Sequence, residues 1–302
     1  MESNVKPSRS GKAALDSVQM LKTLTYNPCV MGVARTLHLT KMLRKCYQWA
    51  TGGGDNILRV NLGMSDSLFH VRDPLEYRTI EQYFIGYERD FIDVLLASFG
   101  EGDVFLDIGA SVGQFTVPIA RKVGSGGLVI AVEPEVNTRA QLEANLKLNR
   151  LSNVRVLGMA LGAERGEGRL VWEDGTCPSL TQPGRKNPGA VANPSPGAVS
   201  GVQVVNIEIG DQVLDRKHLP VPKAVKIDVE GFEYQVILGL RQTLKNASCE
   251  LLCCEIHPAF LPSGTTAELI VEEARSLGFS NIVLNDRSGQ IHMVGHKDRS
   301  PK

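Results

Sequence analysis

An acid and two glycines stand in this sequence where a nucleoside-containing cofactor could be held. The apolar run 104–108 leads into Gly109 and Gly113, which lack a Cβ, so the backbone can turn sharply and lie against a ligand. A second apolar run, 128–132, ends in Glu133. An acid at the end of a second parallel strand can accept hydrogen bonds from the ribose hydroxyls of a bound nucleoside.

The choice of cofactor depends on Asp107 and on the glycine spacing. A dinucleotide-binding turn reads G-x-G-x-x-G and rests a pyrophosphate on a helix N-terminus, but the central glycine is absent here. Asp107 would repel a phosphate, whereas it could attract the cationic amino acid end of S-adenosylmethionine, directly or through water. These residues favour S-adenosylmethionine, although Glu133 suits either cofactor. A simple strand-to-helix turn with two surface acids is the remaining interpretation.

Two more acids and a histidine could take part in proton transfer. Asp228 and Glu230 follow the apolar run 224–227, two residues apart, and both could reach one cleft if the chain stays extended. His257 follows the run 251–255, and an unperturbed pKa of about 6.5 suits a base at neutral pH. Methyl transfer from a sulfonium is an in-line displacement, so a protein mainly aligns the acceptor and supplies a base if the acceptor is an ordinary hydroxyl.

Other roles for these three residues stay open. Asp228 or Glu230 could cap the following helix, whose N-terminus favours acids, and His257 could be a turn residue before Pro258. The two acids could also bind a metal ion, but no third ligand is recognisable, and the six cysteines show no metal-finger spacing. We therefore expect no metal.

Alternating strand and helix patterns must position these residues. Strands are expected at 104–108, 128–132, 154–159, 224–227 and 251–255, and helices at 115–123, 138–148 and 266–277. Such βαβ repetition predicts an α/β fold with a parallel sheet, helices on both faces and ligands at the carboxyl ends of the strands. A closing pair, 281–284 and 291–294, predicts an antiparallel edge strand.

Residues 1–79 are predicted to form an N-terminal extension. It contains a basic amphipathic helix at 35–49, which could lie on a membrane surface but which we expect to pack on the core. Two short strands, 57–61 and 68–71, are expected to form a hairpin.

Residues 80–302 are predicted to form the main domain, beginning with a helix at 80–99 that carries an apolar stripe. Within this domain, the segment 175–201 is rich in proline and glycine and has little apolar periodicity. A loop of this length is expected to be a flexible lid over an acceptor or a plain surface insertion.

Composition excludes several classes of function. The 33 basic residues balance the 33 acidic residues, so nothing indicates a nucleic-acid partner. No run of about 18 apolar residues occurs, and the polar N-terminus lacks the apolar core of a signal peptide. We therefore expect a cytoplasmic protein with no transmembrane segment.

Several sequence blocks resemble those of a known family. They are VFLDIGASVG at 104–113, VEP at 132–134 with LEAN and LN at 142–145 and 148–149, ALG at 160–162, and KIDVEGFE at 226–233. Over about residues 80–285, and most specifically in the last block, the chain resembles the FkbM family of S-adenosylmethionine-dependent methyltransferases. One departure is Ser111, where the family usually has a longer asparagine.

The resemblance implies a Rossmann-like class I methyltransferase fold with a mostly parallel seven-stranded sheet. It also implies O-methylation of a hydroxyl on a sugar or other small-molecule or glycan acceptor, although fold does not fix substrate. Two alternatives remain, a nicotinamide-dependent oxidoreductase and a non-catalytic cofactor-binding module of the same fold. The expected catalytic residues are Asp228, Glu230 and His257. The expected cofactor-binding residues are Asp107, Gly109, Ala110, Ser111, Gly113, Glu133, Pro134, Ala160, Leu161 and Asp228, with Ala160 and Leu161 against the adenine.

Overall fold

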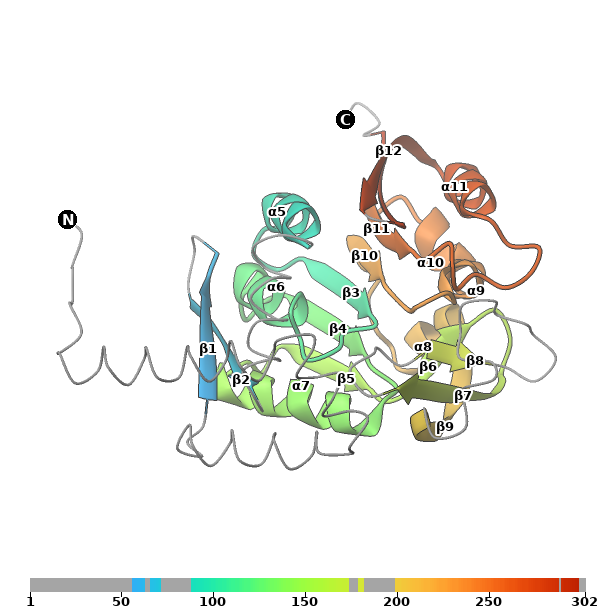
Figure 1. Cartoon of the computed structure of the whole chain (residues 1–302). Helices are drawn as coiled ribbons and strands as arrows, with labels where there is room; N and C mark the ends of the chain where they lie inside the picture. The colour runs from blue at the N-terminus through green and yellow to red at the C-terminus, as the bar shows by residue number, and fades with distance from the viewer. Residues whose placement is uncertain are drawn as a thin grey trace, which may run out of the picture. The chain divides into compact units, whose positions relative to one another are not determined.

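The computed structural model describes residues 56–62, 66–71, 88–173, 179–181, 199–287 and 289–298. Its main element is a seven-stranded sheet (Figure 1). The strands, in chain order, are β3 (Val104–Ile108), β4 (Leu128–Val132), β5 (Val154–Leu157), β10 (Ala224–Ile227), β11 (Leu251–Ile256), β12 (Phe279–Arg287) and β13 (Gln290–Lys297). Their order across the sheet is β12-β13-β11-β10-β3-β4-β5. The chain therefore reverses direction across the sheet between β3 and β10, and ligands of open α/β sheets bind at the carboxyl ends of strands at such a point.

The strand directions confirm the predicted fold class and correct one detail of it. Every neighbouring pair from β5 to β11 is parallel, and β13 runs antiparallel to both β11 and β12. The antiparallel strand is therefore not at the edge, as expected from the sequence, because β12 occupies that place. Helix α11 (Ala267–Ser276) connects β11 to β12, and this long connection allows β12 to lie two places from β11 in the sheet. The next strand, β13, lies between them and pairs with both.

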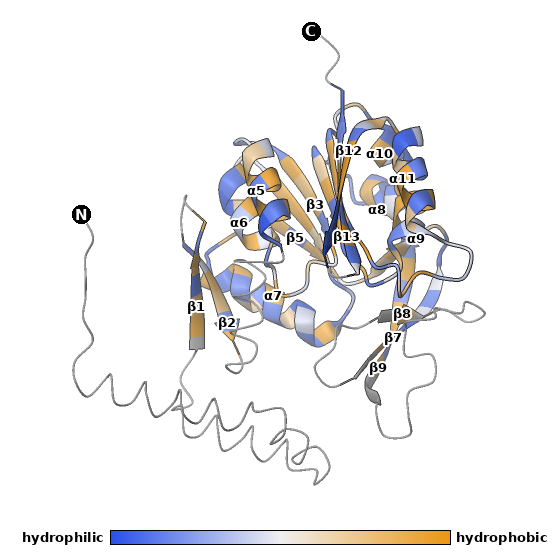
Figure 2. Ribbon diagram, turned by 45° about the horizontal axis from the view of Figure 1, so that its top comes forward, coloured by the Kyte–Doolittle hydropathy of each residue, from blue (hydrophilic) through white to orange (hydrophobic). Residues whose placement is uncertain are grey.

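Helices cover both faces of this sheet. Besides α11 they are α5 (Arg89–Ser98), α6 (Thr116–Val123), α7 (Val136–Leu148), α8 (Gly210–Arg216), α9 (Glu233–Gly239) and α10 (Arg241–Lys245). Helices α5 and α6 lie on one side and α9, α10 and α11 on the other (Figures 1 and 2). Successive side chains of β3 point to opposite faces of the sheet, and each face is covered by its own helices. On one face, Leu106 joins a buried cluster with Val236 of α9 and Ile270 of α11. Its neighbour Phe105 packs edge-to-face on Phe99 at the end of α5.

A smaller four-stranded sheet follows β5. It consists of β6 (Ala160–Gly162), β7 (Gly166–Glu173), β8 (Ser179–Thr181) and β9 (Val199–Ile209), in the order β6-β9-β7-β8. The third predicted strand, expected to run to residue 159, therefore ends at Leu157, and the chain enters the second sheet at Ala160. Of the predicted loop 175–201, residues 179–181 and 199–201 are strand residues, and the others lie outside the described residues.

The predicted hairpin is confirmed, with β1 (Asn56–Asn61) and β2 (Asp66–Val71) forming a two-stranded sheet. The predicted helix at 35–49 lies outside the described residues, as do residues 80–87 of the predicted helix at 80–99, whose described part contains α5. Among the helices that the structure describes, none is long and apolar enough to cross a membrane.

Amide side chains of α7 and of the residue after it complete the backbone hydrogen bonds of β2. Asn149 accepts a bond from the N–H of Leu68 at 2.9 Å and donates to its carbonyl at 2.6 Å. One turn earlier, Asn145 accepts a bond from the N–H of His70 at 2.7 Å. The same Asn145 amide donates to the carbonyl of Val112, in the turn after β3, at 2.8 Å. One helix therefore holds both the hairpin and that turn.

Candidate active site

The turn between β3 and α6 is shaped by residues with positive φ angles. Gly109 has a φ of 77°, Ser111 of 50° and Gly113 of 97°. A Cβ on Gly109 would lie 1.8 Å from the carbonyl oxygen of Asp228, and one on Gly113 would lie 2.8 Å from Cδ1 of Leu142. Only glycine satisfies both the angle and the close approach at these two positions. The first contact also brings the turn directly against the end of β10.

Glu133, which follows β4, is tied to this turn. Its Oε2 accepts a hydrogen bond from the backbone N–H of Ser111, and its Oε1 accepts one from that of Glu135, both at 2.9 Å. Burial raises the pKa of Glu133 to about 7, although the two backbone hydrogen bonds oppose the rise. The predicted ribose-binding acid therefore lies beside the predicted cofactor turn, as the sequence required.

The other predicted cofactor contacts surround this acid. The N–H of Ala110 donates to the carbonyl of the last residue of β4 at 3.0 Å, and the carbonyl of Pro134 accepts a hydrogen bond from Arg139 at 2.9 Å. Ala160 and Leu161 are buried, and they belong to β6 of the smaller sheet. Their contact with an adenine stays a prediction.

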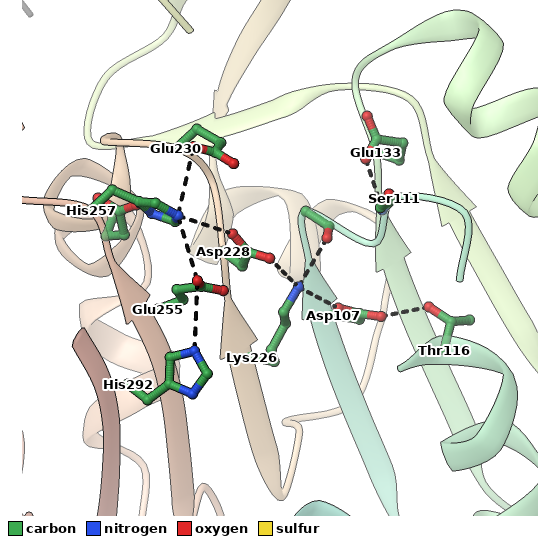
Figure 3. A network of polar contacts seen from close by, with 12 residues as sticks. Asp107, Ser111, Thr116, Glu133, Lys226, Asp228, Glu230, Glu255, His257 and His292 are labelled. Atoms are coloured by element: carbon green, nitrogen blue, oxygen red, sulfur yellow. Dashed lines mark hydrogen bonds and ion pairs between the residues drawn. The ribbon is translucent and has the colours of Figure 1, made fainter. Parts of the chain in front are cut away.

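Asp107 lies beneath the turn in a buried charge network (Figure 3). Its side chain has no exposed surface, its Oδ2 accepts a hydrogen bond from Thr116 at 2.6 Å, and its Oδ1 is 3.7 Å from Nζ of Lys226. That ammonium donates to the carbonyl of Gly109 at 3.0 Å and to Oδ2 of Asp228 at 3.2 Å. Lys226 thus joins the cofactor turn to the end of β10, and the contact of Asp107 with the cofactor stays a prediction.

Lys226 was not among the predicted site residues, although it stands in the most family-specific block. It is 2 % exposed, and its position opposite Asp107 follows from the parallel register of β10 and β3. Burial disfavours its charge, but the carboxylates of Asp228 and Asp107 outweigh this effect and raise the pKa of Lys226 above its ordinary value. The sequence did contain a signal for Lys226: a lysine inside a short strand that is otherwise apolar needs a buried partner of opposite charge.

The structure brings the three predicted catalytic residues together at the ends of β10 and β11. Nε2 of His257 is 3.6 Å from Oε2 of Glu230 and 3.9 Å from Oδ1 of Asp228 (Figure 3). Two residues that were not predicted complete the group. Oε1 of Glu255 is 3.8 Å from the same nitrogen, and Oε1 of Glu233 is 2.8 Å from Nδ1 on the other side of the ring.

These carboxylates change the protonation of His257. Burial disfavours the charged ring, but the hydrogen bond to Glu233 and the charges of Glu233, Asp228 and Glu230 dominate and raise the pKa of His257 to about 10. The premise of an unperturbed histidine is therefore wrong. When no cation is bound, the imidazole is therefore protonated at neutral pH, and a carboxylate is better placed than His257 to accept a proton.

A comparison with known protein families covers the residues of this site. The family model described as "Methyltransferase FkbM domain" matches residues 107–280, which is more than half of the chain. The chain belongs to the FkbM methyltransferase family. The match includes Glu133 and the cluster at the ends of β10 and β11, and it gives no support to a nicotinamide-dependent oxidoreductase.

One curated relative of this FkbM family member is the hexuronic acid methyltransferase AglP of Haloferax volcanii. The two are 27 % identical over 187 residues, which are 59 % of this chain and 66 % of AglP. Solved structures with a similar arrangement include an S-adenosylmethionine-dependent O-methyltransferase from Thermotoga maritima, with 14 % identity, coverage of 86 % and 83 % of the two chains, and a TM-score of 0.39. Another is a precorrin-6y C5,15-methyltransferase from Geobacter metallireducens, with 13 % identity, coverage of 69 % and 89 %, and a TM-score of 0.41.

Proposed function

We propose that this protein transfers the methyl group of S-adenosylmethionine to a hydroxyl oxygen of a sugar or similar small acceptor. The observation that carries the proposal is the contact between Gly109 and Asp228. No Cβ fits between these two backbones, and Lys226 bonds to both residues. A cofactor held in the β3 turn would therefore have its sulfonium close to the carboxylates at the end of β10.

The cofactor end of the site consists of the turn and Glu133. The carboxylate of Glu133 is the proposed acceptor for the ribose hydroxyls, and it is already oriented by the N–H groups of Ser111 and Glu135. Gly109 and Gly113 allow the cofactor to approach the backbone. Ala160 and Leu161 are the proposed apolar contacts of the adenine.

The acceptor end consists of Asp228, Glu230 and His257. In the proposed reaction the acceptor oxygen attacks the methyl carbon, and the carbon–sulfur bond breaks with its electron pair going to sulfur. The products are a methyl ether and S-adenosylhomocysteine, and the hydroxyl proton passes to Asp228 or Glu230. Alignment of the acceptor supplies most of the rate, because the sulfonium is already a good leaving group.

The proposal is tested with radiolabelled S-adenosylmethionine and a panel of acceptors that contains hexuronic acids and neutral sugars. We expect label in a base-stable product, because a methyl ether survives mild alkali whereas a methyl ester does not. Label released by mild alkali would show transfer to a carboxylate instead of a hydroxyl. Tight cofactor binding by calorimetry with no transfer to any acceptor in a source extract would favour the non-catalytic module.

A further inference from the structure

The imidazole of His257 points at three carboxylates that are too far away to share a hydrogen bond with it. Its Nε2 is 3.6 Å from Glu230, 3.8 Å from Glu255 and 3.9 Å from Asp228. Nitrogen and oxygen ligands around one divalent ion lie about 2.0 to 2.2 Å from it and hence roughly 3 to 4 Å from one another. The ligand atoms of Asp228, Glu255 and His257 also all lie within 4.8 Å of one another. The spacing therefore suits an ion at the centre of the group.

The ring of His257 is oriented as a metal ligand would be. Its Nδ1 is 2.8 Å from Oε1 of Glu233, which is fully buried and also accepts a hydrogen bond from the N–H of Gly231 at 2.8 Å. A carboxylate that holds one ring nitrogen and presents the other is the usual support of a metal-binding histidine. Gly231 itself cannot be replaced easily, because a Cβ there would lie 2.4 Å from the carbonyl oxygen of Phe260.

A second histidine, His292, contacts the Glu255 carboxylate from the other side. His292 of β13 stands directly opposite Glu255 in the antiparallel register, and it is 1 % exposed. Neither of its ring nitrogens has a hydrogen-bond partner, and its Nε2 is 3.6 Å from the Glu255 oxygen that faces His257 (Figure 3). A buried, unpartnered imidazole is costly. Its presence indicates that Glu255 is part of a polar centre that is completed by a further ligand.

The charge of the cluster also favours a cation. Lys226 neutralises Asp228 through Oδ2, while Oδ1 of Asp228 remains turned towards His257. Buried carboxylates are stable only when they are protonated, paired or bound to a metal. Glu255 is 5 % exposed; Asp228 and His257 face it on one side, and Glu88 and His292 face it on the other.

We propose that Asp228, Glu255 and His257 bind a divalent transition-metal ion at the acceptor end of the site. This proposal replaces our expectation of no metal, which arose because Glu255 is hidden inside an apolar strand. A ligand set of one imidazole nitrogen and carboxylate oxygens suits Mn²⁺, Co²⁺ or Zn²⁺ better than it suits Mg²⁺, which prefers oxygen ligands alone. The role of the ion rests on the proposed function, since beside the sulfonium it would hold the acceptor oxygen.

The binding of the ion is tested without cofactor or acceptor. The full chain, free of any affinity tag and treated with a chelator, is titrated with Mn²⁺ alone by calorimetry and with Co²⁺ alone by visible absorption. We expect one ion per chain. The variants Glu255→Gln and His257→Gln should each weaken Mn²⁺ binding more than about a hundredfold and abolish the Co²⁺ bands, and Glu233→Gln should weaken it about tenfold to a hundredfold. The matched control His218→Gln changes an exposed histidine and should bind like the wild type.

The outcomes separate this inference from the proposed function. Wild-type Mn²⁺ affinity in both ligand variants would overturn it, provided that their S-adenosylmethionine affinity shows them to be folded. Loss of binding in Glu88→Gln and His292→Gln but not in Asp228→Asn would also overturn it, because the ion would then lie in the inner group of Glu88, Glu255 and His292. Methyl transfer that persists in EDTA would refute the role of the ion alone, whereas one bound ion without any methyl transfer would refute only the proposed function.

Discussion

The backbone N–H of Ser111 donates a hydrogen bond of 2.9 Å to Oε2 of Glu133, so the cofactor turn after β3 and the acid after β4 form one unit. Ser111 holds this geometry at a φ of 50°, in the left-handed region that glycine and asparagine adopt more readily than serine does. The family's preference for asparagine at this position therefore has a backbone explanation. The hydrogen bond from Ser111 orients the carboxylate of this acid.

Replacing Glu133 should weaken cofactor binding. Glu133→Ala removes the proposed acceptor of the ribose hydroxyls, and we expect a loss of about 1.5 to 3 kcal/mol in S-adenosylmethionine affinity, measured by calorimetry. Glu135→Gln is the matched control, because the Glu135 side chain caps α7 by accepting hydrogen bonds from the N–H groups of Asn137 and Thr138. It should lower stability by about 1 kcal/mol and leave the affinity unchanged. Equal affinity in the wild type and Glu133→Ala would remove Glu133 from the site.

The raised pKa of Glu133 predicts a pH dependence of stability. The pKa of Glu133 is about 7 in the folded protein, and its ordinary value is 4.5. At a pH between these two values, Glu133 holds a proton in the folded protein that it has released in the unfolded chain. This contribution to stability is complete below 4.5 and is lost as the pH rises through about 7. Relative to Glu133→Ala, the free energy of unfolding of the wild type should fall by about 3 kcal/mol from pH 4.5 to pH 8. Denaturant titrations at several pH values measure the difference, and a constant difference would contradict the assignment.

Gly109→Ala should be severely destabilising. The new Cβ would lie 1.8 Å from the carbonyl oxygen of Asp228, and backbone atoms cannot move aside as a flexible side chain can. We expect a loss of more than about 3 kcal/mol in the free energy of unfolding. Gly102→Ala is the control that separates the cost of the clash from the cost of the positive φ angle. Gly102 has a φ of 86°, but no atom lies within 4 Å of the position that its Cβ would take. Its cost should be about 1 kcal/mol. Equal costs in chemical denaturation would show that the contact with Asp228 is not tight.

Lys226→Met should destabilise the protein more than removal of an exposed lysine. The ammonium that links Asp107, Asp228 and the carbonyl of Gly109 would be lost, which leaves a buried carboxylate unpaired. The expected cost is about 3 to 5 kcal/mol.

Two further variants check this explanation. Lys223→Met breaks the ion pair with Asp103, in which both side chains are 26 % exposed. This variant should lower the free energy of unfolding by about 1 kcal/mol or less. Adding Asp107→Asn to Lys226→Met should recover part of the loss, because it removes the buried unpaired charge. A double variant as unstable as the sum of the two single variants would show that no such coupling exists.

Much of the cofactor end was predictable, because its signals are local. Gly109, Gly113 and Glu133 lie at strand ends, where spacing along the chain alone predicts a turn and an acid. The fold class followed from the same alternation of strands and helices. The antiparallel strand was misplaced at the edge, because nothing local tells whether a closing hairpin extends a sheet or fills a space within it.

The acceptor end was harder to predict, because it is assembled across strands. Lys226 stands beside Asp107 through a register that joins residues more than a hundred positions apart, and His292 stands opposite Glu255 through the register of β11 and β13. Glu255 and Lys226 lie within apolar strands, and a single charged residue in such a strand does not by itself indicate a functional site. The charge of His257 depends on Glu233 at the start of α9, and nothing in the local sequence relates these two residues, which are 24 positions apart.

The pairing of Asn145 and Asn149 with β2 also has a consequence for the order of folding. The N–H groups of Leu68 and His70 find their acceptors 81 and 75 residues later in the chain, on a helix instead of a strand. Contacts of such long range form only after a large loop has closed, so α7 must exist before the hairpin can dock. Amide exchange at Leu68 and His70 should therefore report the last step of assembly. Because Asn145 also holds Val112 in the turn after β3, cofactor binding at that turn should slow the exchange of these two amides.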